Sequence, residues 1–397
     1  MLRFKQFIVE NEEEQGAKLK HLTHVEDKAF EGSHGTSSAL SALKETHDYI
    51  KSGKSGPNLT MKYDGSPSIV YGHHPETGKF FVASKSAFNK SPKINYTSED
   101  IDHNHGHAPG LAEKLKDALQ HLPKIAPKRG VYQGDLMFSG NDVKHKEDGS
   151  SSFTPNTITY TARGDEADKV KRSRVGVVTH TQYHGNTISS MSADPNPDHH
   201  NFSHHPDVYS KTPEHDTKHV HYSESSQTEF NNHISAAQKL HDAHKDTMYQ
   251  ATEPHGGASG HLATYINQTV RTGEKPTAEG LKGHIAGKYQ KAIDKLKTPA
   301  SQARKSAESQ THMDHIDGNV EHYNNLLKMH GHLQKAKDVL VRTLNQHEGG
   351  LEHHISGNRT DPEGFVFHPT KSNETDGSPI KLVNRAEFSK ANLLKVR

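Results

Sequence analysis

Residues 59–66 read LTMKYDGS, an apolar-alternating run that leads straight into a polar turn. Apolar residues at every second position, Leu59 and Met61, are typical of a half-buried β-strand. Lys62 ends this run, where its amine could act as a nucleophile, and Gly65 would let the backbone approach a phosphate or ribose closely. The same residues also suit an ordinary surface turn between two strands, so this stretch alone leaves both interpretations open.

Further strand-like runs lie on both sides of a long helical region. They comprise residues 68–71, 80–83, 130–132, 157–160 and 175–178 before it, and residues 364–367 and 380–383 after it. Residues 73–78 read HHPETG and predict a hairpin turn between two of these runs. Apolar residues at helical spacing predict helices over 38–50 and 111–122, and helical character across most of 229–346.

This order predicts an α+β fold with antiparallel sheets and flanking helices, in which a helical insertion interrupts the β-rich domain. The expected parts are residues 1–186 for the first part of the β-rich domain, 187–228 for a polar, His-rich loop or linker, 229–348 for the helical insertion, and 349–397 for the last part of the β-rich domain. Residues with possible chemistry fall on both sides of the insertion, so folding has to bring the two β-rich parts together.

Composition narrows the function classes. The chain has no cysteine, which excludes disulfides, thiolate zinc sites and cysteine nucleophiles. It has no long apolar run, and the apolar stretch within residues 1–14 is too short for a signal peptide, so we expect a cytoplasmic protein without a membrane partner. Lysine and arginine number 49 against 48 aspartates and glutamates, so a nucleic-acid site would need a local basic groove.

Histidine is unusually frequent, with 35 residues. Most of these side chains are interpreted as solvated surface groups. The densest group consists of His199, His200, His204 and His205, with Asp198 and Asp207 beside it, and a metal site there is the alternative interpretation.

Two carboxylates and two further lysines stand at strand-like runs. Asp135 closes the run that begins at 131, and Glu363 comes just before the run 364–367. Lys85 follows the run 80–83, and Lys381 lies inside the apolar run 380–383, where its ammonium has to face a polar or anionic partner such as a phosphate. Two carboxylates near a lysine could hold Mg²⁺ against nucleotide phosphates while the lysine attacks.

The order of these motifs resembles the signature of the ATP-dependent polynucleotide ligase and mRNA-capping nucleotidyltransferase superfamily. The motifs are K-x-D-G at 62–65, S-K at 84–85, G-D-L at 134–136, E-G-F-V-F at 363–367 and I-K-L-V at 380–383. The resemblance covers the two β-rich regions and does not extend to the helical insertion. It implies a ligase-type nucleotidyltransferase domain in which the first lysine becomes covalently adenylated or guanylated.

Carried over residue by residue, the resemblance implies a catalytic role for Lys62 as the covalent nucleophile, with Asp64 in the same turn and Lys381 at the α-phosphate. It implies that ATP is the cofactor, with Mg²⁺ or Mn²⁺ held by Asp135 and Glu363. The residues implied to bind the nucleotide are Lys62, Gly65, Lys85, Asp135, Glu363, Lys381 and Tyr160, the last by stacking on the base.

The sequence departs from the family pattern at several positions. Asp135 stands where glutamate is usual, and Val383 takes the place of a second lysine, for which Arg385 or Lys371 could substitute. The stretch KYDGS is closer to RNA ligases than to DNA ligases, because Pro67 stands where DNA ligases usually have arginine. The chain ends at Arg397, soon after the last motif, so we expect no C-terminal OB domain.

The expected function is an ATP-dependent RNA ligase that passes AMP from a lysine to a 5′-phosphate and seals that end to a 3′-hydroxyl. Three alternatives stay open: a DNA ligase of the same superfamily, a GTP-using capping-type transferase, and a non-catalytic nucleic-acid-binding protein that kept the fold. Residues 62–71 and 88–90 also resemble uncharacterised proteins of large tailed bacteriophages, which implies a phage protein acting in the host cytoplasm.

Overall fold

The computed structural model describes residues 22–253, 257–375 and 377–385. The described chain forms two compact units, each built from segments that are distant in the sequence. The sheet unit contains residues 55–215 and 347–363, and the helical unit contains residues 22–54, 216–346 and the segment that begins at 364.

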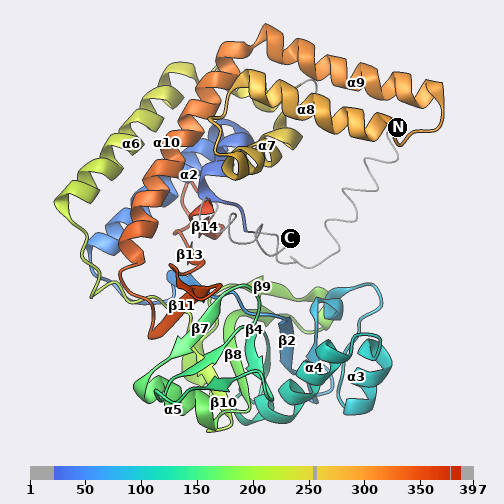
Figure 1. The fold of residues 1–397 in the computed structure, drawn as a ribbon, viewed down its shortest axis with the longest axis vertical. Coiled ribbons are helices and arrows are strands. Elements are labelled where there is room, and N and C mark those ends of the chain that lie inside the picture. The colour runs from blue at the N-terminus through green and yellow to red at the C-terminus, as the bar shows by residue number, and fades with distance from the viewer. Residues whose placement is uncertain (1–21, 254–256, 376, 386–397) are drawn as a thin grey trace. The chain divides into compact units, whose positions relative to one another are not determined.

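Two sheets form the sheet unit (Figure 1). The larger sheet has the order β10 (Val208–Lys211), β8 (Val175–His184), β4 (Gly130–Ser139), β2 (Ser68–His73) and β3 (Phe80–Ala83), with β9 (Ser192–Asp194) on β8. The smaller sheet has the order β12 (Asn358–Arg359), β11 (Leu351–Ile355), β7 (Thr159–Ala162), β6 (Ser151–Phe153) and β5 (Lys144–His145). Neighbouring strands are antiparallel except for β10 and β8, which are parallel.

Both faces of the larger sheet are packed against other residues. Alternate residues of a strand point to opposite faces, so neighbouring residues of one strand enter different clusters. Ile69 and Tyr71 of β2 pack in one cluster with the helices α3 (Ser98–His105) and α4 (Pro109–His121). Val70, between them, packs in a second cluster with Phe81 and Tyr183. The hairpin predicted at 73–78 joins β2 and β3, which pair antiparallel.

A short strand, β1 (Leu59–Lys62), leads into the K-x-D-G turn. Within the sheet unit it pairs with residues 213–215: the Met61 amide donates to the Pro213 carbonyl at 2.7 Å, and the His215 amide donates to the Leu59 carbonyl at 2.8 Å. Leu59 and Met61 are buried, as the alternation predicted. One further helix, α5 (Gly164–Arg172), follows β7.

Helices dominate the second unit. They are α2 (Gly32–Lys51), α6 (Glu224–His244), α7 (Ser259–Thr272), α8 (Ala278–Ile293), α9 (Pro299–Gly318) and α10 (Val320–Leu344), with the 3₁₀ helices η1 (Val25–Glu31) and η6 (Met248–Thr252). Two strands, β13 (Gly364–Phe367) and β14 (Ile380–Leu382), pair antiparallel in this unit.

The apolar face of α10 forms the centre of the helical unit. Tyr323, Leu333 and Leu340 are fully buried, in agreement with the helical spacing of the sequence. Val320, which the same pattern placed on this face, is 44% exposed because it is the first residue of the helix. The neighbouring α9 begins at Pro299, where the Thr298 side chain accepts a hydrogen bond from the Ser301 amide, a favourable helix start.

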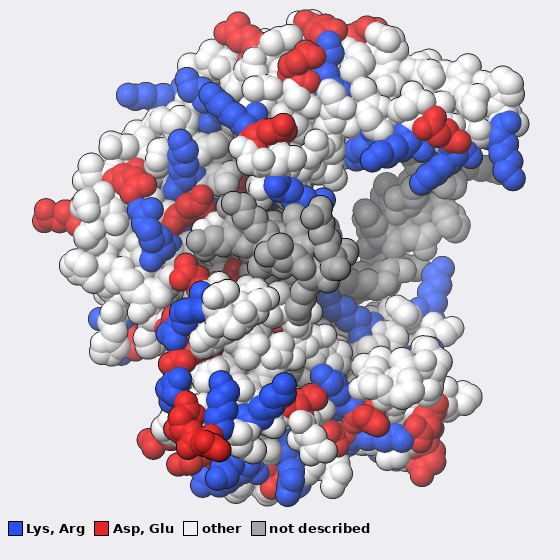
Figure 2. All heavy atoms as spheres, in the orientation of Figure 1, with Lys and Arg blue, Asp and Glu red and all other residues white. Residues whose placement is uncertain are grey.

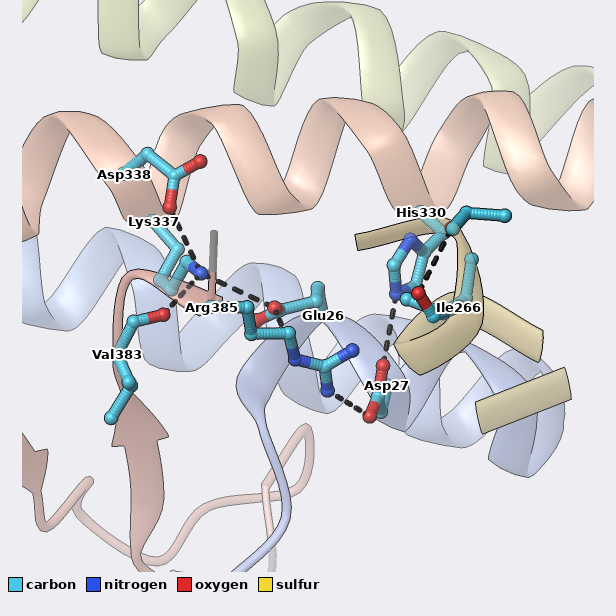
Figure 3. Close-up of polar contacts among 9 residues, drawn as sticks. Glu26, Asp27, Ile266, His330, Lys337, Asp338, Val383 and Arg385 are labelled. Carbon is cyan, nitrogen blue, oxygen red and sulfur yellow. Dashed lines mark hydrogen bonds and ion pairs between the residues drawn. The ribbon is translucent and has the colours of Figure 1, made fainter. Parts of the chain in front are cut away.

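A buried network of charged groups joins three segments of this unit (Figure 3). The Lys337 ammonium on α10 contacts Glu26 at 3.2 Å and donates to the Val383 carbonyl at 2.6 Å. Lys337 and Glu26 are both 0% exposed. Arg385 forms ion pairs with Glu26 and Asp27. The network therefore fixes η1 and the chain after β14 to α10.

Asp27 shows how strongly this network stabilises charge. Burial raises the pKa of Asp27, but the hydrogen bond from His330 and the charge of Arg385 lower it more, to about 2. Because this value lies below the ordinary 3.8, the carboxylate contributes stability at neutral pH and loses that contribution as the pH falls from 3.8 toward 2.

The predicted α+β class, with antiparallel sheets and several helices, is confirmed. The compact units divide the chain differently from the expected domains, since residues 22–54 and the segment from 364 belong with the helices. Residues 187–228, expected as a loop or linker, contain β9 and β10. Residues 1–14, whose apolar stretch was expected to be too short for a signal peptide, lie outside the described residues. Within the described part of the chain, no helix has the length and apolar character to cross a membrane.

We predict that Lys337→Met lowers the free energy of unfolding by about 3 kcal/mol, because removing one partner leaves a buried carboxylate poorly compensated. Urea denaturation followed by circular dichroism measures this loss. Lys335→Met, an exposed position on the same helix, serves as the matched control and should change stability by less than about 0.5 kcal/mol. Equal stability of the two variants would contradict a structural role for the network.

Candidate active site

The K-x-D-G turn is held by the carboxylate of Asp64, which is only 7% exposed. Its Oδ2 accepts hydrogen bonds from the backbone amides of Thr157 at 2.6 Å and Ile158 at 2.9 Å. Its Oδ1 accepts from the Asn156 side chain at 2.8 Å. Three donors from the loop before β7 thus fix the turn to the smaller sheet.

Tyr160, on β7, adds a fourth bond to this junction. Its hydroxyl accepts a hydrogen bond from the Asp64 backbone amide at 2.7 Å. Its ring is fully buried, stacks on Phe153 and contacts the rings of Tyr63 and His353. A ring enclosed in this way does not stack on a nucleotide base in this conformation, so the expected role of Tyr160 is corrected to support of the turn.

The other side of the turn lies against β4. The Ser66 amide donates to the Leu136 carbonyl at 2.8 Å, and the Leu136 amide donates to the Pro67 carbonyl at 3.0 Å. A Cβ atom added at Gly65 would lie 2.6 Å from the Cβ atom of Asp135, closer than side chains tolerate. Gly65 is therefore required for the turn to approach β4, and this approach brings Asp135 beside the K-x-D-G segment.

Lys62 and Glu363 meet although 301 positions separate them in the sequence. The Lys62 ammonium donates a hydrogen bond to Oε1 of Glu363 and forms an ion pair with it. The Lys62 side chain is 30% exposed, whereas Glu363 is 6% exposed. The amine can therefore be reached from solvent, while the carboxylate that holds it is almost fully enclosed.

Asp135 is the second carboxylate near Lys62. Burial raises the pKa of Asp135, but His180, Ser68 and the charge of Lys62 together lower it below its ordinary value. His180 Nε2 lies 3.6 Å from Asp135 Oδ1. Asp135 is thus an anion at neutral pH and lies in the electrostatic field of Lys62.

The donor set suits a hard divalent cation, because Asp135 and Glu363 both offer carboxylate oxygens. Mg²⁺ commonly takes one or two carboxylates and completes its shell with water and substrate phosphates. No group of three or more potential metal ligands occurs among the residues that the structure describes, the His199–His205 region included. Phosphate oxygens of a nucleotide would have to supply the remaining ligands for Mg²⁺.

Other elements of the chain carry the remaining expected site residues. Lys85 begins a 3₁₀ turn after β3, and its side chain is exposed. Lys381 lies on β14 of the helical unit, opposite Val366, and its contribution at an α-phosphate stays a prediction. Arg385, a possible substitute for the missing second lysine, is buried in the ion pairs with Glu26 and Asp27 and has a structural role there.

Two residues that shape the site, His180 and Asn156, are not indicated by the sequence motifs. His180 belongs to β8, whose apolar run was recognised only as far as 178. The strand pattern continues beyond 178 to Tyr183, and His180 is a polar side chain within that continuation. This pattern was the signal in the sequence that could have indicated His180. Asn156 lies in a loop, and no sequence signal connects it with Asp64.

Comparisons with known proteins give a family without a known activity. A family model described as "Family of unknown function (DUF6267)" matches residues 18–397. No curated protein and no solved structure matches the chain.

We predict that Asp64→Asn lowers the free energy of unfolding by about 2–3 kcal/mol. The amide nitrogen of asparagine would replace one carboxylate oxygen and cannot accept the hydrogen bonds that this oxygen receives from the loop before β7. Chemical denaturation of the parent and the variant measures the loss. Asp168→Asn, an exposed aspartate in α5, is the control and should be nearly neutral. A stable Asp64→Asn protein would show that the loop–turn junction does not depend on the charge.

Proposed function

The chain belongs to the DUF6267 family, whose function is unknown, and we propose that it is an ATP-dependent RNA ligase that acts through a covalent lysyl-AMP intermediate on Lys62. The observation that carries the proposal is the ion pair between Lys62 and Glu363, which joins the first and fourth motifs of the series in the folded chain. Asp135, from the third motif, lies beside the same turn. Three motifs that are far apart in the sequence therefore converge at one turn.

The first step would be attack of the Lys62 amine on the α-phosphorus of ATP. The nitrogen–phosphorus bond forms, the bond from the α-phosphorus to the bridging oxygen breaks, and pyrophosphate leaves. Before attack, the ammonium has to give up a proton and leave its ion pair. The carboxylate of Glu363 accepts the hydrogen bond of that ammonium, and the proton would have to pass on to solvent before the same carboxylate could hold Mg²⁺.

Two transfers would follow. An oxygen of the 5′-phosphate attacks the same phosphorus, which releases the Lys62 nitrogen and gives a strand with an adenylated end. The 3′-hydroxyl then attacks the strand's 5′-phosphorus and releases AMP. Mg²⁺ bound through Asp135 and Glu363 would neutralise phosphate charge in these displacements. The buried Asp64 junction would keep the backbone of Lys62 in place throughout.

A nucleic-acid substrate is supported by a basic arm in the helical unit, which we define as residues 286–307 of the α8–α9 hairpin. It contains one acidic residue, Asp294, and six basic ones: Lys288, Lys291, Lys295, Lys297, Arg304 and Lys305. Figure 2 shows lysine and arginine side chains gathered along α8 and at the end of the hairpin. Between Ile285 and Ile316 no residue is buried, so the arm is accessible along its length.

The charges of the arm are mostly uncompensated. Lys305 pairs with Glu308 and lies 4.8 Å above the Tyr289 ring. Within the described chain, no ion pair involves Lys291, Lys295 or Lys297. Because the whole protein is close to neutral, this excess of positive charge is a local feature that suits a phosphate backbone.

We predict that the parent protein, incubated with Mg²⁺ and ATP labelled at the α-phosphate, gives a labelled band on a denaturing gel. Lys62→Ala and Lys62→Arg should abolish the band, since neither side chain can attack at neutral pH. Lys144→Ala, exposed on β5 of the same unit, is the control and should keep full labelling. The label should be lost in acid and kept in alkali, as expected for a phosphoramidate.

Other outcomes separate the alternatives. Labelling by GTP in place of ATP would indicate a capping-type transferase, and sealing of nicked DNA in preference to RNA would indicate a DNA ligase. An absence of labelling with both nucleotides, together with an intact mass that excludes prior adenylation, would overturn the proposed nucleotidyltransferase activity. It would favour a non-catalytic nucleic-acid-binding protein.

We predict that the quadruple variant Lys288→Gln, Lys291→Gln, Lys295→Gln, Lys297→Gln binds single-stranded RNA more weakly and with a smaller salt dependence. For single strands each phosphate contact contributes about 0.7 to the slope of log affinity against log salt, so the slope should fall by up to about 3. Fluorescence anisotropy with a labelled oligoribonucleotide measures it. Lys239→Gln on α6 with Lys245→Gln at the C-terminal cap of that helix, both exposed, is the control, and an equal slope in both variants would exclude the arm.

A further inference from the structure

An open cavity of about 630 Å³ lies in the sheet unit, between the C-terminal part of α5 and β10. This volume is within the range of small-molecule binding sites, roughly 300–1,000 Å³. The charged residues that line it are Glu166, Lys169, Arg172 and Lys211, and His204 and His205 line it as well. The cavity was not recognised in the sequence, because its residues come from separate segments.

The charges in this cavity do not balance. Among the described residues, Glu166 is the only carboxylate that lines it, and both of its oxygens are engaged. Its Oε1 accepts from Lys169 at 2.7 Å, and its Oε2 accepts from the Tyr209 hydroxyl at 2.8 Å. Lys211 and Arg172 therefore remain without a carboxylate partner among the described residues.

Lys211 is the critical group. It follows Tyr209 by two positions on β10, so both side chains lie on the same face of the strand. Burial lowers the pKa of Lys211 and nearby Lys169 lowers it further, while Glu166 opposes this shift from a distance. No hydrogen bond or ion pair of its ammonium occurs within the described chain. A largely enclosed ammonium without a partner is costly, and an anionic ligand would remove that cost.

The basic residues of α5 have a second explanation that does not extend to Lys211. Lys169 and Arg172 lie in the last turn of the helix, where positive charge stabilises the carbonyl end. Arg172 Nε also donates to the Asp168 carbonyl at 3.2 Å. Lys211 comes from a strand, so helix stabilisation does not account for its position.

We propose that this cavity binds a phosphate monoester, with Lys211 and Arg172 as its charge-bearing contacts. A phosphate monoester carries close to two negative charges at neutral pH, which matches the excess of two positive charges in the cavity. Charged hydrogen bonds from lysine and arginine to phosphate are among the stronger polar contacts of proteins. The inference does not depend on adenylation of Lys62.

The test measures thermal unfolding in inorganic phosphate and in chloride at matched ionic strength. Phosphate should raise the melting temperature of the parent in a concentration-dependent way. Lys211→Met should melt at or above the parent's temperature in chloride and should lose the phosphate response. Arg172→Gln, at an exposed position where the loss of helix stabilisation is small, should weaken phosphate binding about tenfold or more.

Lys171→Gln is the matched control, because this exposed lysine lies on the same helix but does not line the cavity. It should respond to phosphate as the parent does. An equal phosphate response in all the proteins, or none in the parent, would overturn the proposal. So would a Lys211→Met protein that keeps the parent's affinity for phosphate.

Two sources of the phosphate can be distinguished with oligonucleotides. A 5′-phosphorylated oligoribonucleotide that binds more tightly than its 5′-hydroxyl counterpart, with the difference lost in Lys211→Met, would identify a strand end as the ligand. Stabilisation by inorganic phosphate without that difference would identify a small phosphorylated molecule. Lys62→Ala should keep both responses, which separates this proposal from the proposed ligase activity.

Discussion

The carboxylate of Asp64 is the constraint on which the arrangement of the sheet unit depends. This carboxylate accepts hydrogen bonds from two backbone amides and one side-chain amide of the loop before β7. The backbone amide of Asp64 donates to the Tyr160 hydroxyl. On the opposite side, Ser66 and Pro67 bond to β4. A single short turn therefore connects the larger sheet to the smaller one. Two of its donors, the amides of Thr157 and Ile158, belong to buried residues, so the turn could not move without leaving them unsatisfied.

This fixed turn determines what surrounds Lys62. Because the backbone on its C-terminal side is immobilised, the lysine side chain has a defined origin from which it reaches Glu363. Gly65 permits the close approach that places Asp135 at the same turn. The rigidity of the junction and the accessibility of the amine are complementary: the enclosed groups hold the geometry, and the partly exposed amine remains available for chemistry.

The two units use charged residues differently. In the helical unit, Lys337 and Arg385 are buried but have carboxylate partners, and the network they form joins segments of the chain (Figure 3). In the sheet unit, Lys211 on β10 is largely enclosed and has no carboxylate partner in the part of the chain that the structure describes. Paired buried charges contribute to the fold, whereas an enclosed charge without a partner has a cost that folding alone does not offset. This contrast distinguishes the paired charges around Lys337 from the charge of Lys211.

The sequence by itself determined the α+β class, the principal strands and the long helices. Strand alternation at 59–61 and helical spacing along α10 reflect burial of one face of a local element, which depends on nearby residues only. The motif order also indicated that Lys62 and Glu363 belong together. The tertiary structure alone decided that Asp64 and Tyr160 support a turn, that His180 lies beside Asp135, and that residues 22–54 fold with the helices. These features depend on contacts between segments separated by tens to hundreds of residues, and the pattern within any one segment carries no information about its distant partners.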